Sequence, residues 1–401
     1  MIRFKRIAII GLPFLLAVAT GAESRPLFQA SLYPLVAGVS QPLFQITKPV
    51  YSTESLSILS LPLSYITVSD RSAPQTKALG SPSEHTDLLR LIEQGNLDEA
   101  LVLLQKMIKN RPNDLNALTL LGTLHYKKDE LNEAIAAWEK VVKADPQNNA
   151  VLAYLDKARR ELGAHSGFTR EMTRHFTIKF DGAENRHLYQ TVMGILEDAY
   201  GEIGRTLYYF PTQEVIVYLY TNQQFFDVTR APAWSGGIFD GKIRIPSKGF
   251  EDKIDALKRI LTHEYVHAVV YQITQQEISE KTGRRAVQVP TWLNEGIAQY
   301  LEFSKLRDGV KNRMKERVKQ GIFIKLSALH GSFMGLDAIQ AGIAYEESLS
   351  AVSFLIDEFG IWRFKMLLED LATKGNIEEA ISSALLVSYD QFQYRWEASL
   401  M

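Results

Sequence analysis

From about Thr86 to Leu162, apolar residues recur every three or four positions, the spacing of helices that bury one face. Within this stretch, Gly95–Asp114 aligns with Asp129–Asn148 at a shift of 34 residues. Identical residues stand at several pairs of positions, among them Leu97 and Leu131, Glu99 and Glu133, Ala100 and Ala134, and Pro112 and Pro146. Alanine lets two helices approach closely, and proline ends the second helix of each unit. The pattern predicts helical hairpins over residues 82–163, closed by a further helix at Asn149–Leu162.

This period and these residue types resemble tetratricopeptide repeats, which are all-helical and stack into arrays. The resemblance implies a groove that takes a protein partner, and the alternative is a helical spacer. An array needs about three repeats to bury a continuous core, whereas this chain shows two repeats and one further helix. We therefore expect the module to pack against the next domain or against another chain.

After Gly167 the pattern changes from helical spacing to a mixture of strands and helices. Four elements are expected before residue 250: a strand at Arg174–Phe180, a helix at Leu188–Leu207, a strand at Glu214–Tyr220 and a hairpin at Trp234–Pro246. The strand at Glu214–Tyr220 is apolar on both faces, and Asp240 with Gly241 forms the turn of the hairpin. The pattern is helical from there to the C-terminus. Strands followed by helices predict an α+β domain over residues 168–401.

Residues 1–22 have the form of a secretory signal peptide. Basic residues stand at Arg3, Lys5 and Arg6, an apolar run follows at Ile7–Ala19, and small residues stand at Ala17, Ala19 and Ala22. The apolar run is shorter than the ~20 residues of a bilayer span, and Pro13 interrupts it. We predict cleavage and export to the periplasm or the medium, with no membrane span after cleavage. The alternative is an anchor that stays uncleaved.

Residues 23–81 carry few charges and are rich in proline, serine, leucine and tyrosine, without a sustained helical or strand period. The prolines argue against regular structure. We expect an extended and mostly irregular segment.

The composition excludes some kinds of site. The chain has 45 basic and 46 acidic residues, so no overall field attracts nucleic acid, and no nucleic-acid partner is expected. Cysteine is absent, so disulfides and thiolate metal ligands are excluded. Any metal site must be built from histidine, aspartate and glutamate.

The stretch "ILTHEYVHAVV", Ile260–Val270, places two histidines four residues apart inside an apolar helical pattern. On a helix, His263 and His267 are separated by about 40° and about 6 Å, so both rings project on one side. Two such nitrogens can occupy neighbouring corners of a tetrahedral zinc site. Glu264 is rotated away from the pair, better placed to contact a water than to bind the metal. The alternative is a pair of hydrogen-bonded core histidines.

A third ligand is expected in "PTWLNEGIAQYLE", Pro290–Glu302, where Glu295 interrupts an apolar helical face. A carboxylate on a second helix completes a His, His, Glu set and leaves the fourth position to water. The alternative for Glu295 is a favourable charge near the start of a helix.

The two motifs resemble those of the gluzincin zinc peptidases, and residues 174–400 are similar to the peptidase MA-like domain that follows tetratricopeptide repeats. The resemblance implies a zincin-like α+β fold, zinc on His263, His267 and Glu295, and Glu264 as the general base. The Gly-x-Met-x-Asn strand of the aminopeptidase branch is absent, which favours cleavage of internal peptide bonds. Thermolysin-like members carry aspartate four residues after the ligand glutamate, where this chain has Gln299.

Three further residues are candidates for the site. Glu302 is our candidate for the carboxylate behind a ligand histidine. Tyr345, in "GIAYEESLSAVSFLIDEFG", is the candidate donor to the tetrahedral intermediate, with a half-buried core tyrosine as the alternative. His330 is the alternative donor.

The sequence therefore predicts an exported zinc-dependent peptidase that takes a protein or peptide substrate, with repeats for recruiting a substrate or partner. An extended substrate would add to the edge of the hairpin Ile238–Ile245. The rival hypothesis is a catalytically idle zinc-binding domain on a tetratricopeptide scaffold for protein interaction.

Overall fold

The computed structural model describes residues 82–93, 95–181, 186–247, 253–281, 287–303 and 308–401. The predicted signal peptide, residues 1–22, and the predicted irregular segment, residues 23–81, lie outside the described residues. Among the helices of these described ranges, none has the length and apolar character needed to cross a membrane.

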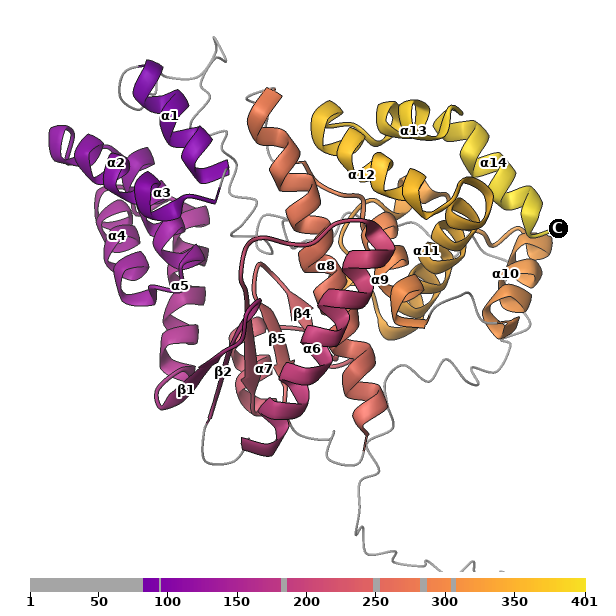
Figure 1. Cartoon of the computed structure of the whole chain (residues 1–401), viewed down its shortest axis with the longest axis horizontal. Helices are drawn as coiled ribbons and strands as arrows, with labels where there is room; N and C mark the ends of the chain where they lie inside the picture. The colour runs from indigo at the N-terminus through magenta and orange to yellow at the C-terminus, as the bar shows by residue number, and fades with distance from the viewer. Residues whose placement is uncertain (1–81, 94, 182–185, 248–252, 282–286, 304–307) are drawn as a thin grey trace, which may run out of the picture.

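Five helices form the repeat module: α1 (Pro82–Glu93), α2 (Leu97–Asn110), α3 (Leu115–Lys127), α4 (Leu131–Ala144) and α5 (Asn149–Ala164), drawn in indigo to magenta in Figure 1. Ala100 and Ala134, the aligned alanines of the sequence repeat, are fully buried where the helices meet. Gly122 on α3 allows another close contact, since a Cβ atom there would lie 2.3 Å from the indole nitrogen of Trp138. That nitrogen donates instead to the Thr119 carbonyl at 3.1 Å. Small residues therefore set the spacing between the helices.

A five-stranded sheet follows the repeats, in the order β1-β2-β3-β5-β4. The strands are β1 (Phe168–Met172), β2 (Phe176–Asp181), β3 (Val215–Tyr220), β4 (Ile238–Phe239) and β5 (Ile243–Pro246). β2, β3 and β5 run parallel, and the outer strands β1 and β4 pair antiparallel with their neighbours. The predicted turn of the hairpin is present, with Gly241 at a φ of +96°. β4 is therefore an edge strand at one side of the sheet.

Two elements of this region were missed by the sequence analysis. β1 is largely exposed, so it lacks the alternation of apolar and polar residues that marks a half-buried strand. The helix α7 (Asn222–Thr229) has only eight residues and is held at its start by a capping box between Thr221 and Gln224. Both are short, and tertiary contacts rather than periodicity define them.

The two faces of the sheet differ in chemistry. Val215, Val217 and Leu219 of β3 face the main core with α6 (Arg186–Leu207) and α8 (Ile254–Lys281). Tyr218 and Tyr220 face the other way, into a cluster with α7. Figure 1 shows the sheet between α6 and α8 on one side and α5 with the other repeat helices on the opposite side. Both faces are therefore covered, which explains why β3 is apolar throughout.

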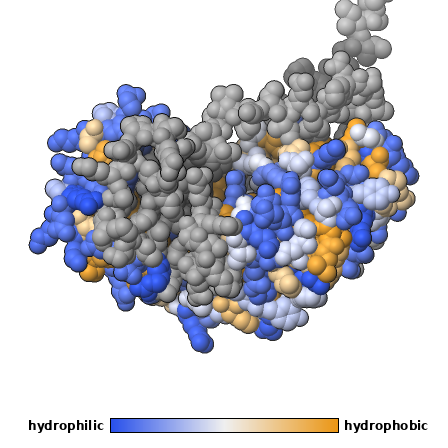
Figure 2. Space-filling view, turned by 90° about the horizontal axis from the view of Figure 1, so that it is seen from above, coloured by the Kyte–Doolittle hydropathy of each residue, from blue (hydrophilic) through white to orange (hydrophobic). Residues whose placement is uncertain are grey.

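After α8 the described residues are mainly helical, as expected: α9 (Thr291–Phe303), α10 (Asp308–Gln320), α11 (Ala338–Phe359), α12 (Ile361–Lys374), α13 (Ile377–Leu385) and α14 (Tyr389–Ser399). Two 3₁₀ turns, Leu326–Leu329 and Phe333–Gly335, separate α10 from α11. The helices share one continuous core with α6, α8 and the apolar face of the sheet. Hydrophilic residues cover most of the described surface visible in Figure 2, with hydrophobic residues in smaller groups. The α+β fold is confirmed.

Candidate metal centre

The two helices that carry the sequence motifs lie against each other. His263 and His267 project from α8 with their ring centres 4.8 Å apart. Glu295, on α9, places its Oε2 atom 3.2 Å from Nε2 of His263 and 3.5 Å from Nε2 of His267. Among the described residues, this trio is the group of histidine and carboxylate side chains that could hold a metal ion.

The two separations between Glu295 and the histidine nitrogens fit a tetrahedral zinc site. Zinc ligands at roughly 2.0–2.1 Å from the ion lie about 3.3 Å from one another when the angles are tetrahedral. The observed separations of 3.2 and 3.5 Å bracket that value. Two imidazoles and one carboxylate are also a donor set that zinc prefers in sites that keep one position open. The residues present therefore fit a catalytic zinc ion.

A further carboxylate lies behind the first histidine. Glu302 Oε2 is 3.3 Å from Nδ1 of His263, and Glu302 Oε1 is 3.7 Å from Nε of Arg259. This contact fixes the orientation and tautomer of the His263 ring, with Nε2 directed at Glu295. Nδ1 of His267 has no hydrogen-bond partner within the described residues. The carboxylate expected behind a ligand histidine thus comes from the residue seven positions after Glu295.

Glu264 is buried next to the trio without belonging to it. Burial raises the pKa of its carboxyl above the ordinary value, while His263 and His267 act in the opposite direction. Gly237, just before the edge strand β4, comes close to this carboxylate, since a Cβ atom there would lie 2.9 Å from Oε1. A glycine at this position therefore leaves room for Glu264 beside the strand.

Tyr345, on α11, lies close enough to the centre to feel the charges of Glu295 and Glu264. Its ring packs edge-on against Trp234 and Phe333, with centres 6.1 and 5.4 Å away. Burial raises the pKa of its phenol well above 10, and the charges of Glu295 and Glu264 raise it further. The phenol therefore keeps its proton and can act as a hydrogen-bond donor beside both carboxylates.

The structure gives His330 a different place. Its Nε2 atom is 3.0 Å from the hydroxyl of Tyr389. Its main-chain carbonyl accepts hydrogen bonds from the amide and the hydroxyl of Thr291 at 3.2 and 3.1 Å. His330 therefore holds the start of α9, and its contacts differ from those of a donor to the metal centre.

The distance between α9 and α11 is set by Gln299 and by Gly296, which the sequence analysis did not single out. Gly296 sits so close to α11 that a Cβ atom would lie 2.4 Å from the Ser348 carbonyl oxygen. Gln299 donates from Nε2 to the Tyr345 carbonyl at 2.9 Å. A glycine directly after the candidate ligand Glu295, inside a helix, was the sequence signal for this contact.

Two family models match parts of the chain. Residues 206–401 match the family model of the Peptidase MA superfamily, and residues 91–158 match that of the Tetratricopeptide repeat. Over these residues, the C-terminal domain is similar to the peptidase MA superfamily. The resemblances found in the sequence are confirmed at the level of both families. No curated protein matches the chain.

The family match begins inside α6, whereas the sheet of the peptidase MA domain begins earlier in the chain. β1 and β2 precede residue 206, yet β2 pairs in parallel with β3 over five residue pairs. Similarity to this superfamily makes a peptidase the first candidate activity, and the repeats indicate a role in protein interaction.

Proposed function

We propose that the peptidase MA domain is a zinc-dependent peptidase that hydrolyses internal peptide bonds. The observation that carries this proposal is the position of Glu264, a buried carboxylate beside a His, His, Glu set to which it does not belong. A structural zinc site has no use for such a group, because its four positions are filled by ligands. The superfamily is typically zinc-dependent, which supports the choice of metal.

The trio His263, His267 and Glu295 would hold the ion. Bound there, zinc supplies a Lewis acid that polarises the peptide carbonyl and makes a water more acidic. Glu264 accepts the proton of the attacking water on its carboxylate and returns it to the leaving nitrogen. The phenol of Tyr345 donates a hydrogen bond to the oxygen on which negative charge develops.

The substrate in this proposal is an extended peptide that pairs with the edge strand β4. Main-chain groups of an edge strand can form hydrogen bonds with an added strand. Gly237 places the start of β4 beside Glu264, so a peptide paired there would pass the catalytic carboxylate. The form of residues 1–22 supports an exported enzyme that acts on periplasmic or secreted substrates.

The test compares wild type with Glu264→Gln on a mixed peptide library, with elemental analysis of zinc on the same samples. We expect Glu264→Gln to keep its zinc, and we expect its rate of peptide hydrolysis to fall by a factor of about 10²–10⁴, the usual effect of removing a general base. Glu358→Gln, an exposed carboxylate on α11, is the matched control and should remain active.

Two outcomes would contradict the proposal. An active Glu264→Gln enzyme would remove the assigned base. Wild-type protein that holds one equivalent of zinc and cleaves no peptide would favour the rival function, a metal-binding domain without catalysis on an interaction scaffold.

A further inference from the structure

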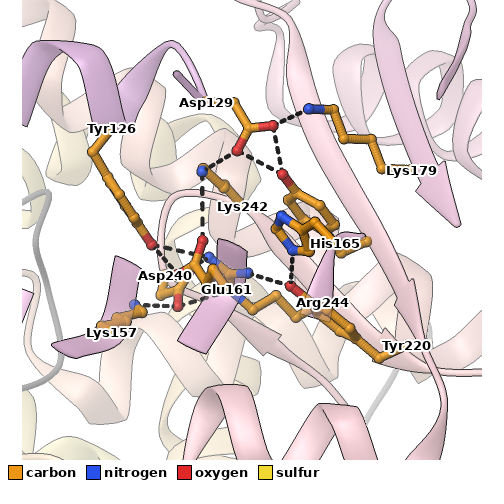
Figure 3. Close-up of polar contacts among 11 residues, drawn as sticks. Tyr126, Asp129, Lys157, Glu161, His165, Lys179, Tyr220, Asp240, Lys242 and Arg244 are labelled. Carbon is orange, nitrogen blue, oxygen red and sulfur yellow. Dashed lines mark hydrogen bonds and ion pairs between the residues drawn. The ribbon is translucent and has the colours of Figure 1, made fainter. Parts of the chain in front are cut away.

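The repeat module and the sheet share a buried network of charges. Asp129, in the turn after α3, contacts Lys179 of β2 and Lys242 beside β5. Glu161, on α5, accepts from Nη2 of Arg244 at 2.9 Å and lies 3.7 Å from Lys242. Figure 3 shows these side chains pointing toward one another from the repeat helices and the strands. Acidic groups of the repeats thus meet basic groups of the sheet.

Several contacts of the network lie at the turn between β4 and β5. Lys157 Nζ, on α5, contacts Oδ2 of Asp240 at 2.6 Å. Nε of Arg244, on β5, donates to the same carboxylate at 3.0 Å. Lys157 and Glu161 are four residues apart, so they project from one side of α5. One helix of the repeats therefore contacts two residues of the hairpin. Asp240 directly follows β4, and Arg244 lies on β5, where it pairs with Ile238 of β4.

These charges are removed from water. Arg244 and Glu161 are fully buried, and Lys242 is 3% exposed. Burial alone would raise the pKa of Asp240, but Arg244 and Lys157 hold it well below its usual range. Each charge therefore depends on its partner across the interface, because an unpaired charge in such a place is strongly unfavourable.

The same turn is close to the candidate metal centre. Asp240 is three residues after Gly237, where an added Cβ atom would lie 2.9 Å from Oε1 of Glu264. Trp234, earlier in the same segment, packs on Tyr345. A single short segment, Trp234–Asp240, thus joins the centre at one end to the repeats at the other.

We propose that α5 of the repeat module positions β4, the strand with which the substrate pairs, beside Glu264. Lys157 and Glu161 are then positioning residues for the peptidase site. This inference rests on the proposed function for its link to catalysis. The repeats are then an integral part of the peptidase rather than a separately attached module. A loosened contact between Lys157 and Asp240 lets β4 move away from Glu264.

The test uses Lys157→Met in the full chain, with Lys157→Arg as the conservative variant. Arg159→Met is the matched control, because Arg159 lies on the same helix but contacts Glu139 of α4 at an exposed position. In Lys157→Met, we expect amide hydrogen exchange in residues 238–246 to become about ten-fold faster, the effect of losing one charged hydrogen bond. Exchange in α2 and α8 should be unchanged.

Catalysis provides a second readout. We expect Lys157→Met to raise KM for peptides long enough to pair with β4, and to lower kcat/KM by up to about 100-fold, the effect of a small displacement in an active site. Zinc content should remain at one equivalent, and Lys157→Arg should restore activity. Asp240→Asn approaches the same contact from the strand, and the double variant should be no worse than the more affected single variant.

Unchanged hydrogen exchange in residues 238–246 of Lys157→Met would overturn the proposal. Equal effects of Lys157→Met and Arg159→Met, or loss of zinc in both, would also overturn it, since either would show a general loss of stability. Suppose that Lys157→Met shows faster exchange in residues 238–246 but the wild-type protein cleaves no peptide. This result would support the positioning of β4 by α5 and contradict the peptidase function, so the two failures are distinguishable.

Discussion

Gln299 donates a hydrogen bond from its side-chain amide to the main-chain carbonyl of Tyr345 at 2.9 Å. Gln299 lies one helical turn after Glu295, and Tyr345 lies beside Glu295 and Glu264. The hydrogen bond therefore ties the helix that carries the candidate metal ligand Glu295 to the helix that carries the candidate oxyanion donor. In thermolysin-like peptidases this position is aspartate, so its role here differs, and Glu302 supplies the carboxylate behind His263.

The close contact between α9 and α11 can be tested with Gly296→Ala. A Cβ atom there would lie 2.4 Å from the Ser348 carbonyl oxygen and 2.5 Å from Cγ2 of Val352, so the helices must separate. We expect a loss of roughly 1–3 kcal/mol in the free energy of unfolding, measured in urea, and a lower affinity for zinc.

The control is Gly194→Ala, an exposed helical glycine at which an added Cβ meets nothing within 4 Å. It should be neutral or stabilising by up to about 1 kcal/mol. A Gly296→Ala protein as stable as Gly194→Ala would contradict the close packing of α9 on α11.

The role of Tyr345 can be tested with Tyr345→Phe, which removes the hydroxyl and keeps the ring against Trp234 and Phe333. We expect zinc binding to persist and kcat to fall by about 10²–10³, the usual cost of removing one donor to the oxyanion. Tyr394→Phe, at a largely exposed position on α14, serves as the control. A normal kcat in Tyr345→Phe would contradict the donor role and indicate that Tyr345 only packs against its neighbours.

The metal ligands can be tested by elemental analysis of single variants. His263→Ala and His267→Ala should each lose zinc, because two ligands seldom hold the ion in water. Glu302→Gln should keep zinc with an affinity about 10–100-fold lower, the effect of removing a partner behind a ligand histidine. His330→Ala is the histidine control, and retention of a full equivalent of zinc in His263→Ala would refute the assignment.

A buried carboxylate outside the site predicts how stability changes with pH. Glu347, on α11, is fully buried, and burial raises the pKa of its carboxyl to about 8. Its Oε2 atom accepts from the Ile324 amide at 3.1 Å. In the unfolded chain this carboxyl titrates near its ordinary pKa of about 4.3. Between these two values the folded protein holds a proton that the unfolded chain has lost, so its contribution to stability falls as pH rises.

Glu347→Gln cannot titrate and should remove this dependence. The free energy of unfolding of the variant, relative to that of wild type, should increase by on the order of 2–5 kcal/mol as the pH rises from about 4.3 to about 8. Urea unfolding at pH 5 and pH 8 measures the difference, with the exposed Glu358→Gln on the same helix as control. A difference between wild type and Glu347→Gln that is constant across pH would rule out the raised pKa.

The sequence by itself determined the features that depend on local spacing. The shift of 34 residues identified the repeats, because each repeat is one pair of helices with fixed small positions. The spacing of His263 and His267 placed both rings on one side of a helix, since helical geometry fixes the angle between positions four apart. Glu295 could be singled out because it interrupts an apolar face that would otherwise be buried.

Only the tertiary structure decided how these local features are combined. Lys157 and Asp240 are 83 residues apart in the chain, and nothing in either local pattern indicates that they form an ion pair. The same holds for the contact of Glu302 with His263 and for the approach of Gly296 to Ser348. Such contacts depend on how whole helices and strands pack, and packing is set by the summed burial of many side chains rather than by the spacing of a few.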